Sequence, residues 1–218
     1  MNNLNYFTKI SASCAALALM TLAGCASHKP IDYAPTQVES ANQAEAWELQ
    51  GKLAVRTADD KFSTNLYWFH TQTNDDLTLT TMLGTTVMTL NKTPSQASLE
   101  IEDKVYQDSD AEELLRRLTG WSIPVDTLPL WITGQISAQD EVVAVDEQGR
   151  PKEVLNHTGS SPWHVSFNSW QQQSGAELPR LLQLQRDEIR LKLQVSQWQA
   201  LTPTPIKASQ PESTDDKQ

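Results

Sequence analysis

Trp47-Glu-Leu-Gln-Gly-Lys-Leu-Ala-Val55 alternates apolar and polar residues with a period of two. Successive side chains of a β-strand point to opposite faces of a sheet, so Glu48, Gln50 and Lys52 share one face and the apolar residues share the other. Ile189-Arg-Leu-Lys-Leu-Gln-Val195 shows the same alternation. Both segments therefore predict strands with one buried face.

Shorter or less regular strand patterns occupy most of the chain between these two segments. Turn-forming residues such as Asn74-Asp75-Asp76 and Gln148-Gly149 separate them. About ten short strands in sequence predict a mostly β fold, an antiparallel meander that closes or curls into a barrel. The further candidate strands are Phe62–Thr71, Leu77–Met82, Thr86–Asn91, Ser98–Glu102, Glu141–Val145, Val154–His157, Trp163–Ser169 and Leu178–Gln185.

A helical pattern interrupts the strands. Ser109-Asp-Ala-Glu112 has the form of a capping box, in which Ser109 caps the helix. Leu114, Leu115 and Leu118 follow at helical spacing, and Gly120 ends the run.

A second helical turn follows over Leu128–Ile132, with Thr127 as its cap and Gly134 as its stop. Pro129 is compatible with the first turn of a helix. Because this helical insert is amphipathic, it has to cover something apolar. We expect it to cover the open mouth of the curled sheet.

The amino terminus has the features of a cleavable secretory signal over residues 1–24. Lys9 is its single charged residue, and an apolar stretch follows from Ile10 to Leu22. This stretch is too short to span a bilayer, which takes about 20 apolar residues. It closes on Leu22-Ala-Gly-Cys25, which resembles the lipobox of bacterial lipoproteins. We therefore expect lipidation of Cys25; the alternative is a plain secretory signal with a chance Cys.

Three consequences follow from the lipobox. Cys14 leaves with the signal, so the mature chain forms no disulfide. Acyl chains on Cys25, at about 0.8 kcal/mol per buried CH₂, anchor the protein stably. In lipoproteins an Asp after the Cys commonly marks retention in the inner membrane, so Ala26 resembles a signal for export to the outer membrane.

The rest of the chain has the size of one domain. Residues 25–44 are polar and contain Pro30 and Pro35, which predicts a flexible tether after the lipidated Cys. Residues 202–218 have a similar composition and predict a disordered tail. A single domain is expected over residues 45–201.

The net charge of the chain is −10, and loss of Lys9 with the signal changes it to −11. Such a charge disfavours electrostatic binding to nucleic acid or to an anionic membrane surface. Membrane contact beyond the anchor is therefore expected to be apolar and local.

No pattern of catalytic or metal-ligating residues is present. The His residues, His28, His70, His157 and His164, lack ligand partners at metal-binding spacings. No Gly-x-Ser-x-Gly segment supplies a nucleophile. We expect no enzyme activity, no metal and no cofactor.

The chain contains seven Trp, which are spread over the candidate strands and the insert. Two interpretations stay open. Their side chains fill the core of the barrel, or the inward faces leave room for acyl chains, as in barrels that hold a ligand.

From Trp47 to Trp198 the chain resembles the LolB family of outer-membrane lipoprotein receptors. The most specific block is Leu118-Thr-Gly-Trp-Ser-Ile-Pro-Val125, which continues to Leu130-Trp-Ile-Thr-Gly134. The other matching stretches are Trp47–Val55, Met82-Leu-Gly-Thr-Thr86, Trp163-His-Val-Ser-Phe167 and Ile189–Leu193.

The resemblance implies an incomplete antiparallel barrel of about eleven strands, in which the helical insert is a lid over an apolar cavity for acyl chains. The residues expected to line the cavity or form the lid are Trp47, Trp68, Leu114, Leu115, Leu118, Trp131 and Ile132. The family also has an exposed apolar residue in a loop, usually within Pro-Leu-Gly. Here the match is Met82-Leu83-Gly84, with Met in place of Pro, and we expect this loop to enter the lipid interface.

The resemblance further implies a LolA-like periplasmic carrier as donor and the periplasmic face of the outer membrane as the place of delivery, by a monomeric protein. Without a nucleotide site, transfer has to run on differences in affinity. Two rival hypotheses are a structural lipoprotein of an envelope assembly complex and a lipid-modifying enzyme, for which no nucleophile–base set is visible.

Overall fold

A computed structural model of the protein describes residues 33–159 and 161–204. The expected signal peptide, Cys25 and the first part of the tether lie outside the described residues, as does the tail from residue 205. The elements of the described part are β1 (Tyr33–Pro35), the 3₁₀ helix η1 (Ala41–Gln43), β2 (Ala46–Arg56), β3 (Lys61–Thr71), β4 (Asp75–Thr80), β5 (Thr86–Lys92), β6 (Ala97–Ile101), β7 (Lys104–Asp108), α2 (Ala111–Thr119), α3 (Leu128–Ile132), β8 (Asp140–Val145), β9 (Pro151–Asn156), β10 (Trp163–Gln173), β11 (Ala176–Arg186) and β12 (Ile189–Pro203).

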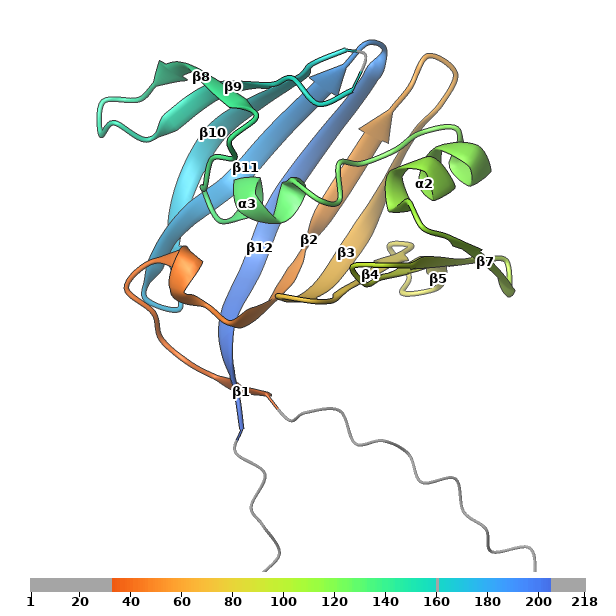
Figure 1. Ribbon diagram of the computed structural model, residues 1–218, viewed down its shortest axis with the longest axis horizontal. Helices are drawn as coiled ribbons and strands as arrows, with labels where there is room; N and C mark the ends of the chain where they lie inside the picture. The colour runs from red at the N-terminus through yellow and green to blue at the C-terminus, as the bar shows by residue number, and fades with distance from the viewer. Residues whose placement is uncertain (1–32, 160, 205–218) are drawn as a thin grey trace, which may run out of the picture. The chain divides into compact units, whose positions relative to one another are not determined.

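The strands form one antiparallel sheet in the order β7-β6-β5-β4-β3-β2-β12-β11-β10-β9-β8, and β1 pairs with β12 outside this path. The two ends of the path, β7 and β8, do not pair with each other, so the sheet curls without closing (Figure 1). This confirms the prediction of an incomplete antiparallel barrel with a helical insert.

The two segments with the clearest alternation lie side by side in the middle of the sheet. β2 pairs with β12, and Leu53 stands opposite Leu193. Both leucines are buried, as are Leu49 and Val55. The predicted buried face of each strand is therefore the inner face of the curl.

Several strand boundaries differ from the prediction. β4 ends at Thr80 rather than Met82, because a turn begins there. β7 was not predicted, since its side chains are exposed or half-buried and show no apolar alternation.

The expected tether and tail partly belong to the sheet. Tyr33 pairs with Pro203 and Pro35 with Leu201, so β1 extends the pairing of β12. The Thr36 amide also donates to the carbonyl of Ala200 at 2.9 Å. Backbone pairing, which composition does not reveal, fixes these polar residues.

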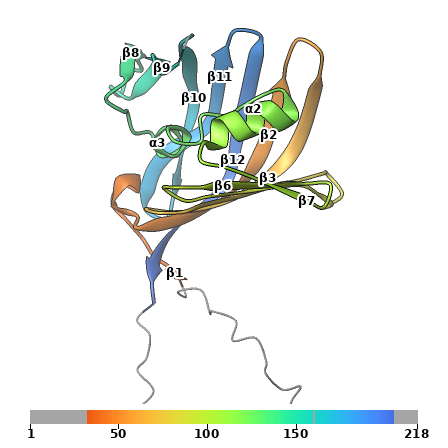
Figure 2. The ribbon, with the colours of Figure 1, turned by 45° about the vertical axis from the view of Figure 1, so that its right-hand side comes forward.

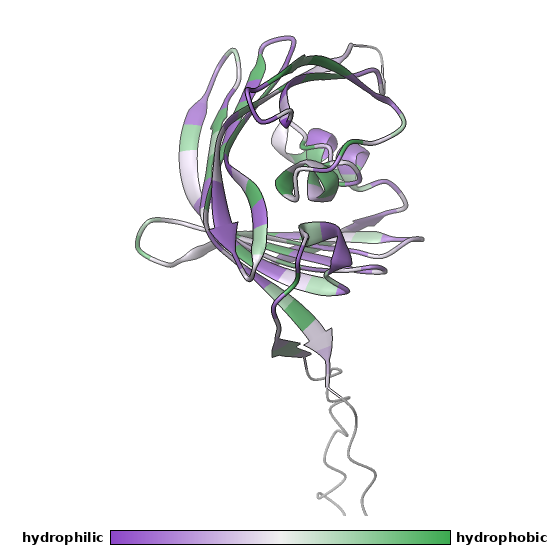
Figure 3. Ribbon diagram, turned by 90° about the vertical axis from the view of Figure 1, so that its left-hand side faces the viewer, coloured by the Kyte–Doolittle hydropathy of each residue, from purple (hydrophilic) through white to green (hydrophobic). Residues whose placement is uncertain are grey.

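The apolar core lies on the inner face of the sheet and beneath the two helices. Figure 3 shows the sheet curling around the helices. Within the described residues no helix is long and apolar enough to cross a membrane.

Candidate functional site

The helical insert connects the two unpaired edges of the sheet. Because it runs from β7 to β8, the chain has to cross the open side of the curl. Figure 2 shows α2 and α3 in this position, between the β6–β7 and the β8–β9 sides. The insert lies where a lid was predicted.

The first helix buries two of its predicted lid residues completely. Leu114 and Leu115 are at 0% exposure, and Leu118 is partly buried against the same core. The N-cap is Asp110, whose carboxylate accepts the Glu113 amide at 3.0 Å. The prediction of Ser109 as the cap was wrong by one residue, since Asp caps as well as Ser does.

The second helix is anchored through its indole. Trp131 and Ile132 are fully buried. The Trp131 Nε1 donates to Asp140 Oδ2 at 3.0 Å, and Asn156 Nδ2 donates to the other oxygen of Asp140 at 2.7 Å. A carboxylate at the start of β8 therefore holds α3 against the sheet edge.

Trp47 and Trp68 lie next to each other in the core, with ring centroids 5.6 Å apart. Trp68 Nε1 donates to Asp75 Oδ1 at 3.0 Å, and Trp47 stacks on His70 at 4.7 Å. His70 contacts the same oxygen of Asp75 at 2.7 Å. Asp75 thus binds the polar atoms of Trp68 and His70 at one place, while Trp47 packs against both rings.

An ion pair ties the linker between the helices to β5. Lys92 Nζ lies 2.8 Å from Asp126 and 3.6 Å from Asp75. Burial acts to lower the pKa of Lys92, but its hydrogen bond and charge interaction with Asp126 outweigh this, and the pKa is raised. Lys92 therefore remains charged and joins the insert to the sheet.

A second, weaker ion pair joins α2 to β11. Glu112 Oε2 lies 3.8 Å from Arg186 Nη2, and the Arg186 guanidinium stacks 4.3 Å above the Trp163 ring. Burial raises the pKa of Glu112 to about 7, although Arg186 acts in the opposite direction. The Nε of Arg186 and the indole Nε1 of Trp163 are buried and unpaired. In this part of the contact between the insert and the sheet, hydrogen bonding of the buried polar groups is therefore incomplete.

Apolar side chains of the sheet and the insert meet in one core cluster. An open groove of about 930 Å³ lies on the outer face of the sheet, not beneath the insert. Its exposed polar lining alternates along the strands with buried residues such as Val55, Leu184 and Leu191.

The loop between β4 and β5 exposes the apolar residues predicted for it. Leu83 is 96% exposed and Met82 60%. The loop is closed by its own backbone, since the Thr81 amide donates to the Thr85 carbonyl at 2.8 Å and the Gly84 amide to the Thr81 carbonyl at 3.0 Å. Asn65 Nδ2 also donates to the Thr81 carbonyl at 3.1 Å. The apolar tip is therefore held out from the sheet without a proline at position 82.

No group of three or more His, Cys, Asp or Glu that could hold a metal is found in residues 33–159 and 161–204. His157 lies 3.1 Å from Glu141 at the surface, and His164 faces the open groove. His28 lies outside the described residues.

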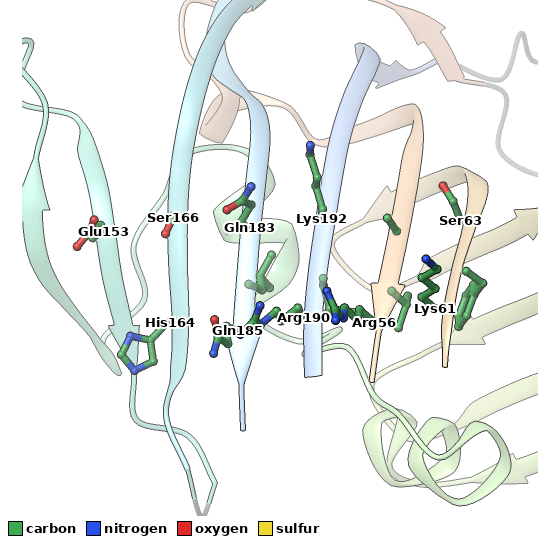
Figure 4. Close-up of a pocket in the computed structure, with 15 residues that line it drawn as sticks. Arg56, Lys61, Ser63, Glu153, His164, Ser166, Gln183, Gln185, Arg190 and Lys192 are labelled. Atoms are coloured by element: carbon green, nitrogen blue, oxygen red, sulfur yellow. The ribbon is translucent and has the colours of Figure 1, made fainter. Parts of the chain in front are cut away.

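Sequence reasoning missed two features. Glu112 and Arg186 meet across the lid contact, which no spacing reveals. The outer face of β2, β3 and β12 gathers several Lys and Arg residues (Figure 4). Alternation had placed Lys52 on that face, but the neighbour relation between β2 and β12 is visible only in the folded sheet.

Comparisons with known proteins agree with this architecture. The model of the family described as outer membrane lipoprotein LolB matches residues 45–198. The chain is 95% identical over 218 residues to the outer-membrane lipoprotein LolB of Shewanella loihica, covering 100% of both chains. It is 58% identical over 202 residues to the LolB of Shewanella sediminis, covering 93% of this chain and 92% of that one.

Among solved structures, a LolA superfamily protein from Nitrosomonas europaea superposes with a TM-score of 0.50 at 8% identity, over 72% of this chain and 86% of that chain. This similarity concerns the fold alone. The family match and the close relatives are specific, and on these grounds the chain belongs to the LolB family of outer membrane lipoproteins.

Proposed function

We propose that this protein is an outer-membrane receptor that accepts lipoproteins from a LolA-like periplasmic carrier and inserts them into the membrane. The observation that carries the proposal is the helical insert, which crosses the open side of the sheet and covers an apolar inner face. An acyl chain that replaces the insert against this face keeps its CH₂ groups out of water. Each buried CH₂ contributes about 0.8 kcal/mol.

The insert is suited to move because its polar contacts with the sheet are few. In the described residues the main ones are Lys92–Asp126, Arg117–Asp108, Arg186–Glu112 and Trp131–Asp140. The remaining contact is apolar and tolerates an apolar replacement. Leu114, Leu115, Leu118, Trp131 and Ile132 are the proposed lid residues, and Trp47 and Trp68 belong to the proposed acyl-binding surface.

The direction of lipoprotein transfer follows from differences in the affinity for acyl chains. The receptor has to hold acyl chains more tightly than the carrier does and less tightly than the bilayer. Leu83 is the proposed point of contact with the bilayer, with Met82 and Gly84 as the rest of the loop. Removal of residues 1–24 and lipidation of Cys25 provide the proposed anchor at the periplasmic face of the outer membrane. The protein is proposed to act as a monomer, without enzymatic chemistry.

The proposal is tested by transfer of a radiolabelled lipoprotein from purified carrier to this protein, followed by separation of the two. We expect the label to move to this protein. Label that stays on the carrier contradicts the proposal, and favours the rival role of a structural lipoprotein in an envelope assembly complex.

A matched pair of variants locates the acceptor surface. Leu118→Asp places a charge at the edge of the lid contact, so acceptance should fall. Leu83→Asp makes the same change at an exposed position, and acceptance should be unchanged. Circular dichroism confirms that both variants are folded. If a folded Leu118→Asp protein accepts lipoprotein as well as the parent does, the proposed role of the insert as a lid is wrong.

A further inference from the structure

The outer face of the sheet carries a cluster of five cations, called here the basic face. β2, β12 and β3 are neighbours in the sheet. Arg190 stands directly opposite Arg56, and Arg56 directly opposite Lys61. In the next rows Lys192 stands opposite Ala54, and Gln194 opposite Lys52. The basic face consists of Lys52, Arg56, Lys61, Arg190 and Lys192, all exposed.

None of these five cations makes an ion pair within the part of the chain that the structure describes. Asp59, Asp60, Asp187 and Glu188 lie in the hairpins at the ends of the same strands, and none of them forms an ion pair with the basic face. Like charges directly opposite each other on neighbouring strands are destabilising. The fold therefore gains nothing from this arrangement, which points to a ligand of opposite charge.

The basic face is also hollowed. Four of its cations, together with neutral polar side chains such as Ser63, Gln183 and Ser166, line the open groove of about 930 Å³ (Figure 4). Glu153 is the one carboxylate in this lining, at the β9 side. Cationic hydrogen-bond donors on the walls of a groove bind phosphate groups strongly. The basic face is therefore better suited to a phosphate-bearing head group than to an apolar ligand.

The basic face continues into the β4–β5 loop. The row that contains Lys52 runs across Asn65 to Thr80, the last residue before the loop. Asn65 also holds the Thr81 carbonyl at 3.1 Å. One cation of the basic face, Lys52, thus stands in the row of the sheet that ends at the loop that carries Leu83.

The described chain begins on that face as well. Tyr33 packs edge-on against Phe69 with ring centroids 5.3 Å apart, and Phe69 alternates with buried Trp68 on the outer side of β3. Phe69 and Asn65 are four residues apart on β3, or about 13 Å. Cys25 precedes Tyr33 by eight residues, which span at most about 29 Å. The described chain thus starts on the side of the sheet that carries the basic face.

We propose that the basic face binds the anionic phospholipid head groups of the bilayer surface while Leu83 enters its apolar layer. The proposal rests on the proposed function and adds the lipid class that the docking surface recognises. The net charge of −10 conceals this local cluster, and the proposal adds a charged contact to the apolar membrane contact that the sequence predicts. Glu48 accepts a hydrogen bond from the Tyr67 hydroxyl. It lies on β2 beyond Lys52, toward the start of the strand, and the basic face ends before it.

The test measures co-sedimentation of the Cys25→Ala protein with vesicles of phosphatidylcholine, with and without phosphatidylglycerol, at low and high salt. Removing the acylated Cys keeps the anchor from dominating the partition. Lys61→Gln with Lys192→Gln removes two cations of the basic face. Lys104→Gln with Lys152→Gln is the matched control, on β7 and β9.

We expect binding only to the vesicles with phosphatidylglycerol, and weaker binding at high salt. Each Lys or Arg near an anionic surface changes the partition about fivefold, so the Lys61/Lys192 variant should lose about 30-fold and the control almost nothing. Both double variants should be as stable as the parent, since none of the four lysines makes an ion pair in the described part of the chain.

Equal binding to both vesicle types, or unchanged binding of the Lys61/Lys192 variant, overturns the proposal. A variant that keeps vesicle binding but accepts less cargo from the carrier also overturns it, because the basic face then docks an acidic protein. Acceptance by the unaltered protein tests the proposed function separately, since vesicle binding requires no cargo.

Discussion

The helical insert and the β4–β5 loop both place large apolar residues between strands, but their environments are opposite. The insert buries Leu114 and Leu115 completely, whereas the loop leaves Leu83 at 96% exposure. The difference lies in length and closure. The insert is long enough to cross the open side of the sheet and reach its inner face. The loop is closed by hydrogen bonds between Thr81, Gly84 and Thr85, and its tip stays exposed.

This contrast separates two roles for hydrophobicity in one protein. Burial of the insert stabilises the fold, so its apolar residues contribute to the free energy of unfolding. Exposure of Leu83 contributes nothing to folding. An apolar residue without a structural role is therefore the better candidate for direct contact with lipid.

The largest expected effect comes from the same substitution at the two places. Leu115→Ala should lower the free energy of unfolding by about 2–5 kcal/mol, because it leaves a cavity in the core. Leu83→Ala should change it by less than about 0.5 kcal/mol. Urea denaturation measures both. Similar values for the two variants contradict the contrast between the insert and the loop.

Two glycines sharpen the comparison through backbone and packing. Gly134, after the insert, and Gly84, in the loop, both have positive φ, at 73° and 88°. A Cβ at Gly134 lies 2.7 Å from Trp170 Cζ3, whereas a Cβ at Gly84 has nothing within 4 Å. Gly84→Ala should cost about 1–2 kcal/mol from strain alone. Gly134→Ala should have the same strain cost and a further cost of about 1–3 kcal/mol from overpacking against Trp170. Thermal unfolding with matched urea curves measures the difference, and equal costs contradict a tightly packed insert.

The pH dependence of stability tests the lid contact through Glu112. Its pKa is raised from 4.5 to about 7 in the folded state, so the folded protein binds more protons than the unfolded one between these values. Stability from this residue is therefore fully present below about pH 4.5 and is lost as the pH rises through about 7. Between about pH 5 and pH 8 the parent should lose on the order of 1–3 kcal/mol of unfolding free energy through Glu112, and the Glu112→Gln variant should not show this loss. Parallel stability curves for the variant and the parent contradict a raised pKa of Glu112 in the folded protein.

Much of the fold could be predicted from local pattern. The alternation in β2 and β12 identified their buried faces, and the leucines at helical spacing identified α2. β7 and β1 escaped prediction because edge pairing requires no apolar alternation. The helix cap moved from Ser109 to Asp110 because both residue types satisfy the first amides equally well.

The sites were less predictable than the fold. The exposed tip at Leu83 was predicted from a family resemblance and a turn, and both signals lie within a few consecutive residues. The basic face depends on pairing between β2 and β12, about 140 residues apart along the chain, and net charge gave the opposite expectation. The contact between Glu112 and Arg186 likewise joins distant segments. Chemistry that is assembled by long-range pairing is not present in any single stretch of sequence.

The central claim is that acceptance by the insert and delivery by the loop are separate steps, and Leu83→Glu tests it most directly. The variant is loaded with a labelled lipoprotein from the carrier, and the label is then followed into liposomes; Leu83→Ile serves as the apolar control. We predict that Leu83→Glu accepts cargo as the parent does, because Leu83 contacts no part of the core, while its delivery to liposomes falls sharply. Leu83→Ile should deliver almost normally. Delivery by Leu83→Glu at the parent rate, or loss of acceptance together with delivery, would contradict the account.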